Sequence, residues 1–284
     1  MTIDRSSWWW RRGRAVLAVF LVLLATGWAT GPLEQTAWGA ARARQPELNL
    51  RDLQGALGQG LVMGVLGGFR TIMADFSWIS AYYSWAKQDP ITAPQTEALI
   101  YLTTLLDPQS VYFWSNGASI IGKDIPSWYV RRGRKITQDE YMTIKREQGE
   151  RAQQLLDRGL TFHPQNWVLL RDKAMIYQWN MLEPEASVES WRRAAEAPGA
   201  PYYLARVYAE LLANQGRTRE AYDYYRKLYP TLPNKVPAAA KDVVWERLRE
   251  LEDTLKLPPD QRLPASDAPP GYQPPAPDIL APTH

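Results

Sequence analysis

Three prolines recur along this chain at a nearly constant spacing. Pro164, Pro198 and Pro233 lie 34 and 35 residues apart. A proline ends a helix because it has no amide hydrogen and its ring clashes with the preceding turn. A period near 34 residues is the signature of stacked helix–turn–helix repeats. The spacing therefore predicts an all-α fold built from helical hairpins.

The residues between the prolines repeat as well. The first helix of each unit carries a large apolar residue or alanine, then alanine four residues later, then a large apolar residue three beyond. These positions are Trp114, Ala118, Ile121, Leu170, Ala174, Tyr177, Ala205, Ala209 and Leu212. The second helices repeat at Thr96, Ile100, Thr103, Ala152, Leu156, Gly159, Ser187, Trp191, Ala194, Ala221, Tyr225 and Leu228. Such spacings place the residues of each helix on one face, where we expect them to pack.

At these positions the chain resembles the tetratricopeptide repeat (TPR) family. The clearest unit is "PYYLARVYAELLANQGRTREAYDYYRKLYPTLP", residues 201–233, with Gly216 at the turn. In the weaker unit "VLLRDKAMIYQWNMLEPEASVESWRRAAEAP", Lys173 and Arg193 replace the small or apolar residues that the family prefers. The stretch "GGFRTIMADFSWISAYYSW" is also similar to the start of other membrane-anchored bacterial repeat proteins.

The resemblance covers residues 70–233 and implies a right-handed superhelix of TPR-like hairpins. Members of this family bind peptides or proteins along a concave face. Matching the family's groove positions to this chain gives a partner-binding groove. Its expected residues are Tyr112, Ser115, Arg171, Gln178, Tyr203, Arg206 and Glu210.

The interval from Pro108 to Pro164 is longer than one repeat by about 22 residues. The surplus lies around residues 124–141, which form either an extended loop or longer helices. Insertions into repeat arrays often lie on the binding face. The aromatic and basic residues there could form an anion- or partner-binding patch: Trp128, Tyr129, Arg131, Arg132 and Arg134. The alternative is a solvated loop whose aromatic residues cap the core.

The N-terminal part of the chain has the pattern of a membrane address. Residues 1–14 form a basic stub, and residues 15–33 are apolar and flanked by tryptophans. Arginines before the apolar run predict a cytoplasmic N-terminus and a C-terminal domain outside the cytoplasm. Residues 15–33 fit a transmembrane anchor or a cleaved signal peptide. The whole chain has 33 Lys and Arg against 30 Asp and Glu, and the stub accounts for the excess, so the body has no nucleic-acid-binding face.

The segments that flank the repeats also have distinct compositions. Residues 34–69 are expected to form a linker and a glycine-rich helix, in which Gly60, Gly64 and Gly68 recur every four residues. That spacing suits close helix packing, either in a second membrane span or, as we prefer, at the start of the soluble domain against the membrane surface. Residues 234–257 are expected to form an amphipathic capping helix. Residues 258–284 are proline-rich and are expected to be disordered or PPII-like.

The residues needed for most catalytic chemistry are missing. The chain has no cysteine and only His163 and His284, so we expect no metal site, no cofactor and no enzymatic activity. A carboxylate-based glycoside hydrolase could draw only on Asp75, Asp107, Asp124 and Asp172, most of which adjoin helix ends.

The sequence thus favours a single-pass inner-membrane protein whose TPR-like domain is a scaffold in the bacterial cell envelope. Its partners would be other envelope proteins or peptides, with no nucleic acid and no metal. The alternative is a glycan-binding or glycan-cleaving helical-hairpin domain that acts in the envelope.

Overall fold

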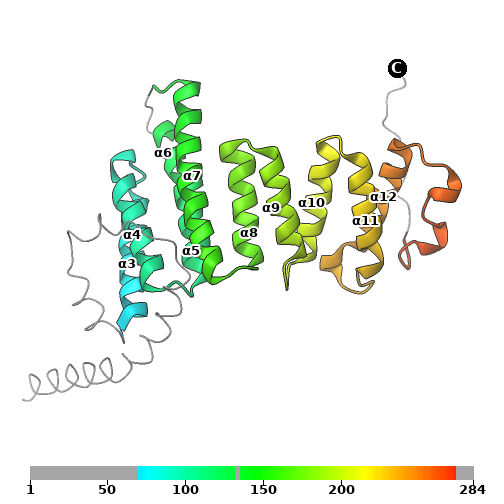
Figure 1. Cartoon of the computed structure of the whole chain (residues 1–284), viewed down its shortest axis with the longest axis horizontal. Helices are drawn as coiled ribbons and strands as arrows, with labels where there is room; N and C mark the ends of the chain where they lie inside the picture. Colours follow the sequence, from blue (N-terminus) through cyan, green and yellow to red (C-terminus); the bar gives the residue numbers. More distant parts are fainter. Residues whose placement is uncertain (1–68, 132–134, 273–284) are drawn as a thin grey trace, which may run out of the picture. The chain divides into compact units, whose positions relative to one another are not determined.

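The computed structural model describes residues 69–131 and 135–272 (Figure 1). The stub 1–14, the anchor or signal peptide 15–33 and all but the last residue of the segment 34–69 lie outside the described residues. Arg132, Arg134 and residues 273–284 lie outside them too. Within the described ranges, no helix is both long enough and apolar enough to cross a membrane.

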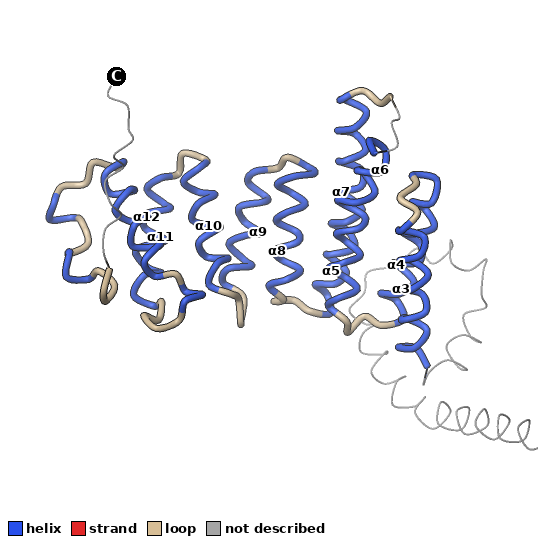
Figure 2. The backbone as a smooth tube through the Cα atoms, turned by 180° about the vertical axis from the view of Figure 1, so that it is seen from behind, coloured by secondary structure: helices blue, strands red, loops and turns tan. Residues whose placement is uncertain are grey.

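The described part of the chain is all-α, as the prolines predict, and Figure 2 shows only helices and loops there. Each repeated proline follows the end of a helical segment. Helix α4 (Ala93–Leu106) ends before Pro108, α7 (Gln138–Phe162) before Pro164, and α9 (Pro184–Glu196) before Pro198. Helix α11 (Thr218–Leu228) continues into the 3₁₀ turn Tyr229–Thr231 before Pro233. The prolines thus mark the ends of the second helices.

The chain divides into two compact units after Pro164. In the first unit, α3 (Arg70–Ala86) pairs with α4 through the 3₁₀ turn Pro90–Thr92. Helix α5 (Val111–Ser119) and the short α6 (Ile125–Arg131) pack against the long helix α7. The Arg70 guanidinium joins the ends of the first hairpin by donating to the Leu105 carbonyl at 3.0 Å.

In the second unit each helix packs against the next in sequence order. The order is α8 (Trp167–Ile176) with the π-helical turn Tyr177–Met181, α9, α10 (Tyr202–Asn214), α11 and α12 (Lys241–Thr254), with the 3₁₀ turn Pro237–Ala239 before α12. Gly216 separates α10 from α11 with a φ of 77°. The amides of Gly216 and Arg217 donate to the carbonyls of Ala213 and Leu212, which is the Schellman arrangement that favours glycine.

The repeated small and large residues form the cores of both units, which confirms their predicted packing role. All of the repeated positions are buried except Tyr177 and Leu228, which are half-buried. The alanines allow close helix approach, and the large side chains fill the space beside them. In the first unit Gly117 on α5 has the same role, because an added Cβ would lie 2.6 Å from Ile100 Cγ2.

The surplus residues between Pro108 and Pro164 lengthen the helices instead of forming an extended loop. Helix α5 continues through the π-helical turn Ile120–Asp124 into α6, and α7 is 25 residues long. The π-helical turn precedes Pro126, which lacks the amide hydrogen that a regular helix would use there. At the other end of the surplus, Thr137 and Glu140 form a capping box that starts α7.

The structure corrects the proposed insertion patch. Trp128 is 1% exposed and belongs to the core. Residues 114, 118, 121, 125 and 128 continue one buried face from α5 into α6, and Trp128 is the last of them. Tyr129 is half-buried, and exposed Arg131 donates to Gln88 at 3.4 Å. Trp128 therefore cannot belong to a surface patch, and the prediction for Arg132 and Arg134 falls outside the described residues.

The structure also corrects the start of the predicted disordered tail. Residues 258–272 follow a defined path with 3₁₀ turns at Pro259–Gln261 and Ala265–Asp267. The tyrosine hydroxyls of the second unit donate to this segment, Tyr222 to the Gln261 carbonyl and Tyr229 to the Asp267 carbonyl. The Leu263 amide donates at 2.8 Å to the carboxylate of fully buried Glu252. These hydrogen bonds from the second unit hold residues 258–272 in place. The proline-rich composition of the segment did not reveal them.

Candidate functional site

The predicted groove residues of the second unit lie on the first helix of each hairpin. Arg171 comes from α8, Tyr203, Arg206 and Glu210 from α10, and their contacts reach α12. We call the side chains Arg171, Tyr203, Arg206, Glu210 and Arg247 the polar row. Its members are neither fully exposed nor buried, so each keeps part of its surface open to a ligand.

At the α8 end of the polar row, Arg171 is held on three sides. Its Nε and one terminal nitrogen donate to Asp172 Oδ1 at 2.9 and 2.7 Å. The guanidinium lies 5.5 Å from the centre of the Trp167 ring, and the Tyr203 side chain lies beside it. Because Tyr203 is on α10, this contact joins the first helices of two successive hairpins.

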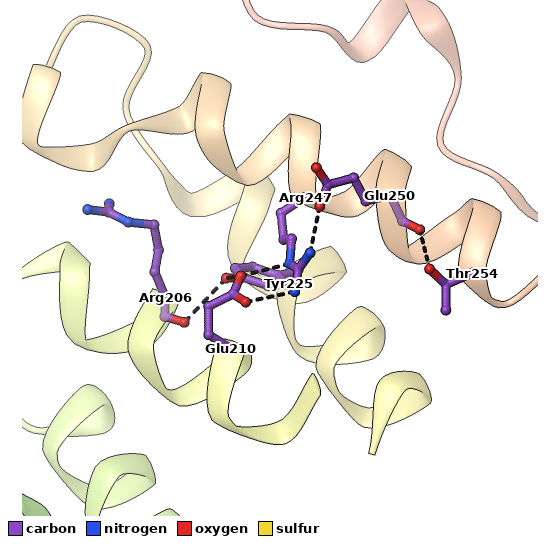
Figure 3. Close-up of polar contacts among 6 residues, drawn as sticks. All are labelled: Arg206, Glu210, Tyr225, Arg247, Glu250 and Thr254. Atoms are coloured by element: carbon purple, nitrogen blue, oxygen red, sulfur yellow. Dashed lines mark hydrogen bonds and ion pairs between the residues drawn. The ribbon is translucent and has the colours of Figure 1, made fainter. Parts of the chain in front are cut away.

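At the other end, Glu210 is the centre of a polar cluster (Figure 3). Arg247 of α12 donates two parallel hydrogen bonds to its carboxylate, both at 2.8 Å. Such bidentate pairs are among the stronger and more directional polar contacts in proteins. Arg247 also donates to Glu250, so its guanidinium joins a carboxylate of α10 and a carboxylate of α12.

Tyr225 of α11 is the third member of this cluster. Its hydroxyl donates to Glu210 Oε1 at 2.9 Å and lies 3.3 Å from the Arg206 carbonyl. Burial, followed by the negative charge of Glu210, raises the pKa of Tyr225 well above its usual value of 10.0. The phenol is therefore a fixed neutral donor that orients the Glu210 carboxylate.

The guanidinium of Arg206 points away from Glu210, as Figure 3 shows. It donates to the carbonyls of Ala238 and Ala239 at 3.3 and 3.0 Å. Ala240, which follows, has a φ of 45°, and α12 begins at the next residue. Arg206 thus holds the linker that leads into α12, and its primary contacts are structural.

The remaining predicted residues lie apart from the polar row. Gln178 lies in the π-helical turn after α8 and accepts a 3.3 Å hydrogen bond from the Trp191 indole of α9. Tyr112 and Ser115 belong to the first unit. Tyr112 is 57% exposed, and its ring packs edge-on against Trp78 at 5.6 Å. The structure therefore brings together Arg171, Tyr203, Arg206 and Glu210.

The sequence did not identify two features of the surface. The first is Arg247, which lies within the predicted capping helix. The sequence did not show that its guanidinium contacts Glu210 of α10. The second feature is an exposed row of large apolar residues on α3. The alternation of large residues at 72, 76, 79 and 83 with small ones at 74, 77, 81 and 84 was a signal for it.

The four carboxylates that a glycosidase could use have different surroundings. Asp124 accepts a 2.8 Å hydrogen bond from the Trp85 indole, and Asp107 accepts one from the Gln109 amide. Asp172 holds Arg171, and Asp75 is exposed on α3. His163 Nε2 lies 3.1 Å from the Pro108 carbonyl at the end of α7. Within the described ranges, no group of three or more His, Asp or Glu side chains could hold a metal ion.

The chain matches no protein-family model, no curated protein and no solved structure. The resemblance to TPR hairpins therefore stays an expectation from the residue pattern.

Proposed function

We propose that this chain is a scaffold, anchored in the bacterial inner membrane, whose TPR-like hairpins bind segments of other envelope proteins outside the cytoplasm. The observation that carries the proposal is the polar row. Residues expected from the family resemblance lie on α8 and α10, and Arg247 of α12 continues them through its contact with Glu210. A row of this kind on successive first helices is what a repeat protein presents to a peptide.

The chemistry of the polar row suits a peptide better than a small molecule. It offers guanidinium donors, a carboxylate acceptor and a tyrosine hydroxyl, all half-exposed. Each group is held by a neighbour, so little side-chain freedom is lost when a ligand binds. Because the row carries three guanidinium groups and one carboxylate, it would favour segments with acidic side chains.

The proposal can be tested by site-specific photo-crosslinking in intact cells. A photoreactive residue would replace Tyr203 in the polar row or, as the matched control, exposed Arg226 on α11. We expect discrete protein adducts from position 203 and none of the same size from position 226. An Arg171→Glu change should abolish those adducts without changing the level of the protein.

The alternative, a glycan-binding or glycan-cleaving domain, predicts a different result. In that case the purified chain would be retained on envelope polysaccharide, and position 203 would give no protein adducts. That combination would exclude the scaffold proposal. The reverse combination, protein adducts without polysaccharide retention, is the expected one.

A further inference from the structure

Helix α3 carries a row of large apolar side chains that nothing in the described structure covers. Ile72, Phe76, Ile79 and Tyr83 are 50%, 61%, 62% and 71% exposed. Their spacing of four, three and four residues places them on one face of the helix. We call these four residues the α3 stripe. Contiguous exposed apolar surface of this kind marks an interaction site.

Helix α3 cannot rotate to bury the stripe, because its opposite face is packed against α4. That face is built from small residues, Ala74, Ser77, Ala81 and Ser84, which are buried against α4. Ser77 donates to the Leu99 carbonyl at 3.1 Å, and Thr96 donates to the Ser84 hydroxyl at 3.0 Å. These hydrogen bonds and close contacts fix the helix, so the large residues must face outward.

We propose that the α3 stripe is the docking site of residues 53–66 of the same chain, which fold back along α3 as an antiparallel helix. The described chain begins at Phe69, at the N-terminus of α3, so this segment is covalently adjacent to the stripe. Gly67 and Gly68 lie between them and suit a sharp reversal of the chain.

The sequence of the segment mirrors the spacing of the stripe. In an antiparallel pair, facing residues have position numbers with a constant sum. Reflection about position 68 sets Gly64 opposite Ile72, Gly60 opposite Phe76, Leu57 opposite Ile79, and Leu53 opposite Tyr83. The facing side chains are therefore small near the reversal, where the two helices are closest, and large at the open end.

Length and charge agree with this pairing. A helix over residues 53–66 would be about 21 Å long, and the stripe extends over about 16 Å. Residues 53–69 contain no Asp, Glu, Lys or Arg, which matches the uncharged stripe. At the open end, the Lys87 ammonium lies 5.0 Å from the Tyr83 ring, and Asp52 directly precedes the segment. Asp52 can therefore pair with Lys87 at that end, while Arg51 beside it keeps this end of the segment neutral overall.

A membrane surface fits the α3 stripe less well. Helices that lie in the membrane interface carry Lys and Arg on their polar face. On α3 the only such residue is Arg70, which is buried and hydrogen-bonded to α4, and exposed Asp75 lies beside the stripe. The docked segment is independent of the proposed partner binding, because the polar row belongs to the other unit.

Thiol cross-linking of the full-length chain in native membranes tests the pairing, because the natural chain has no cysteine. Leu53→Cys would be combined with Tyr83→Cys or, as the control, with Tyr82→Cys. Both tyrosines are exposed, and they point about 100° apart around the helix axis. With a short bismaleimide we expect an intramolecular cross-link several-fold more abundant for 53/83 than for 53/82.

Three results would overturn the proposal. Equal or absent cross-linking of the two pairs would show that residues 53–66 do not lie on the stripe. A cross-linked dimer through position 83 would identify a second copy of the chain as the occupant. Protection of a cysteine at position 83 by lipid, with no cross-link to position 53, would identify the membrane.

A second measurement does not depend on the cross-linker. Gly60→Leu would place a bulky side chain opposite Phe76, whereas Gly58→Leu adds the same side chain on the far face of the segment. In a chain with Ile79→Cys, we expect Gly60→Leu to raise the rate of labelling by a water-soluble maleimide several-fold, and Gly58→Leu to leave it unchanged. Equal labelling rates in the two variants would contradict the docked helix.

Discussion

Tyr225 shows how one side chain links the core of the second unit to its surface. Its ring is 1% exposed and packs at a repeated second-helix position, while its hydroxyl donates to Glu210 in the polar row. A phenolate at this place would lie buried beside a carboxylate, which is why the pKa of Tyr225 is raised from 10.0. The folded state thus holds this proton more tightly than the unfolded state.

This difference predicts a loss of stability in alkali. Because the pKa of Tyr225 is higher in the folded state, its contribution is complete below about pH 10 and is lost as the pH rises further, by up to about 1.4 kcal/mol per pH unit. Tyr225→Phe should cost about 1–2 kcal/mol near neutral pH. Urea denaturation at several pH values should show the two proteins converging above pH 10, and parallel curves would contradict the assignment.

Gly117 gives a second prediction at the residue scale. Its added Cβ would lie 2.6 Å from Ile100 Cγ2 and 3.1 Å from Leu155 Cδ2, so Gly117→Ala should overpack the first unit. We expect a net loss of about 1–2 kcal/mol, because the clash exceeds the gain of about 1 kcal/mol in helix propensity. In an Ile100→Ala background the closer contact is absent and only the 3.1 Å contact with Leu155 Cδ2 remains, so the same change should be close to neutral. A loss in both backgrounds would exclude the clash as the cause.

At the scale of the helices, the extended element from α5 to α6 replaces the expected surface patch with core. Trp128 ends the buried face that begins at Trp114, and the π-helical turn before Pro126 keeps the element continuous. The surplus length in this unit therefore deepens its packing against α7.

Alanine substitutions distinguish the core role from a binding role. Trp128→Ala should lower the free energy of unfolding by about 3–5 kcal/mol, because it leaves a large cavity. Arg131→Ala, a change at an exposed neighbour, should alter it by less than about 0.5 kcal/mol. Chemical denaturation followed by tryptophan fluorescence would measure both. A stable Trp128→Ala protein would show that the side chain does not support the core.

The helices themselves could be predicted from the sequence, but many of their contacts could not. Pro108, Pro164 and Pro198 are followed after three or four residues by α5, α8 and α10, and the repeated alanines are buried. Local sequence determines these features. The pairing of Glu210 with Arg247 depends on how α12 packs, which no local pattern specifies. On α3 both faces are largely apolar or small, so hydropathy alone could not show which face packs against α4.

At the scale of the whole molecule, the end of the second unit is closed by residues 257–272. Buried Glu252 receives the Leu263 amide, and the Tyr222 and Tyr229 hydroxyls reach carbonyls of this segment. Arg262 also donates to Asp253 at 2.6 Å. The segment is therefore part of the folded unit.

Truncation tests this role. A chain that ends at Leu257 loses one hydrogen-bond partner each of the Tyr222 hydroxyl, the Tyr229 hydroxyl and the Glu252 carboxylate, although Glu252 keeps its ion pair with Arg249. At about 1 kcal/mol for each hydrogen bond, we expect the unfolding free energy to fall by about 3 kcal/mol. A chain that ends at Tyr272 should keep full stability in the same denaturation experiment. Equal stability of the two truncated chains would show that residues 258–272 contribute nothing.

The closing segment also determines how molecules of this chain can meet one another. When nothing covers the last helix of a helical array, the apolar face that would pack against a further hairpin is exposed. Copies could then add end to end into filaments. Because residues 258–272 lie against α11 and α12, we expect them to occupy that last position and to limit polymerisation at this end.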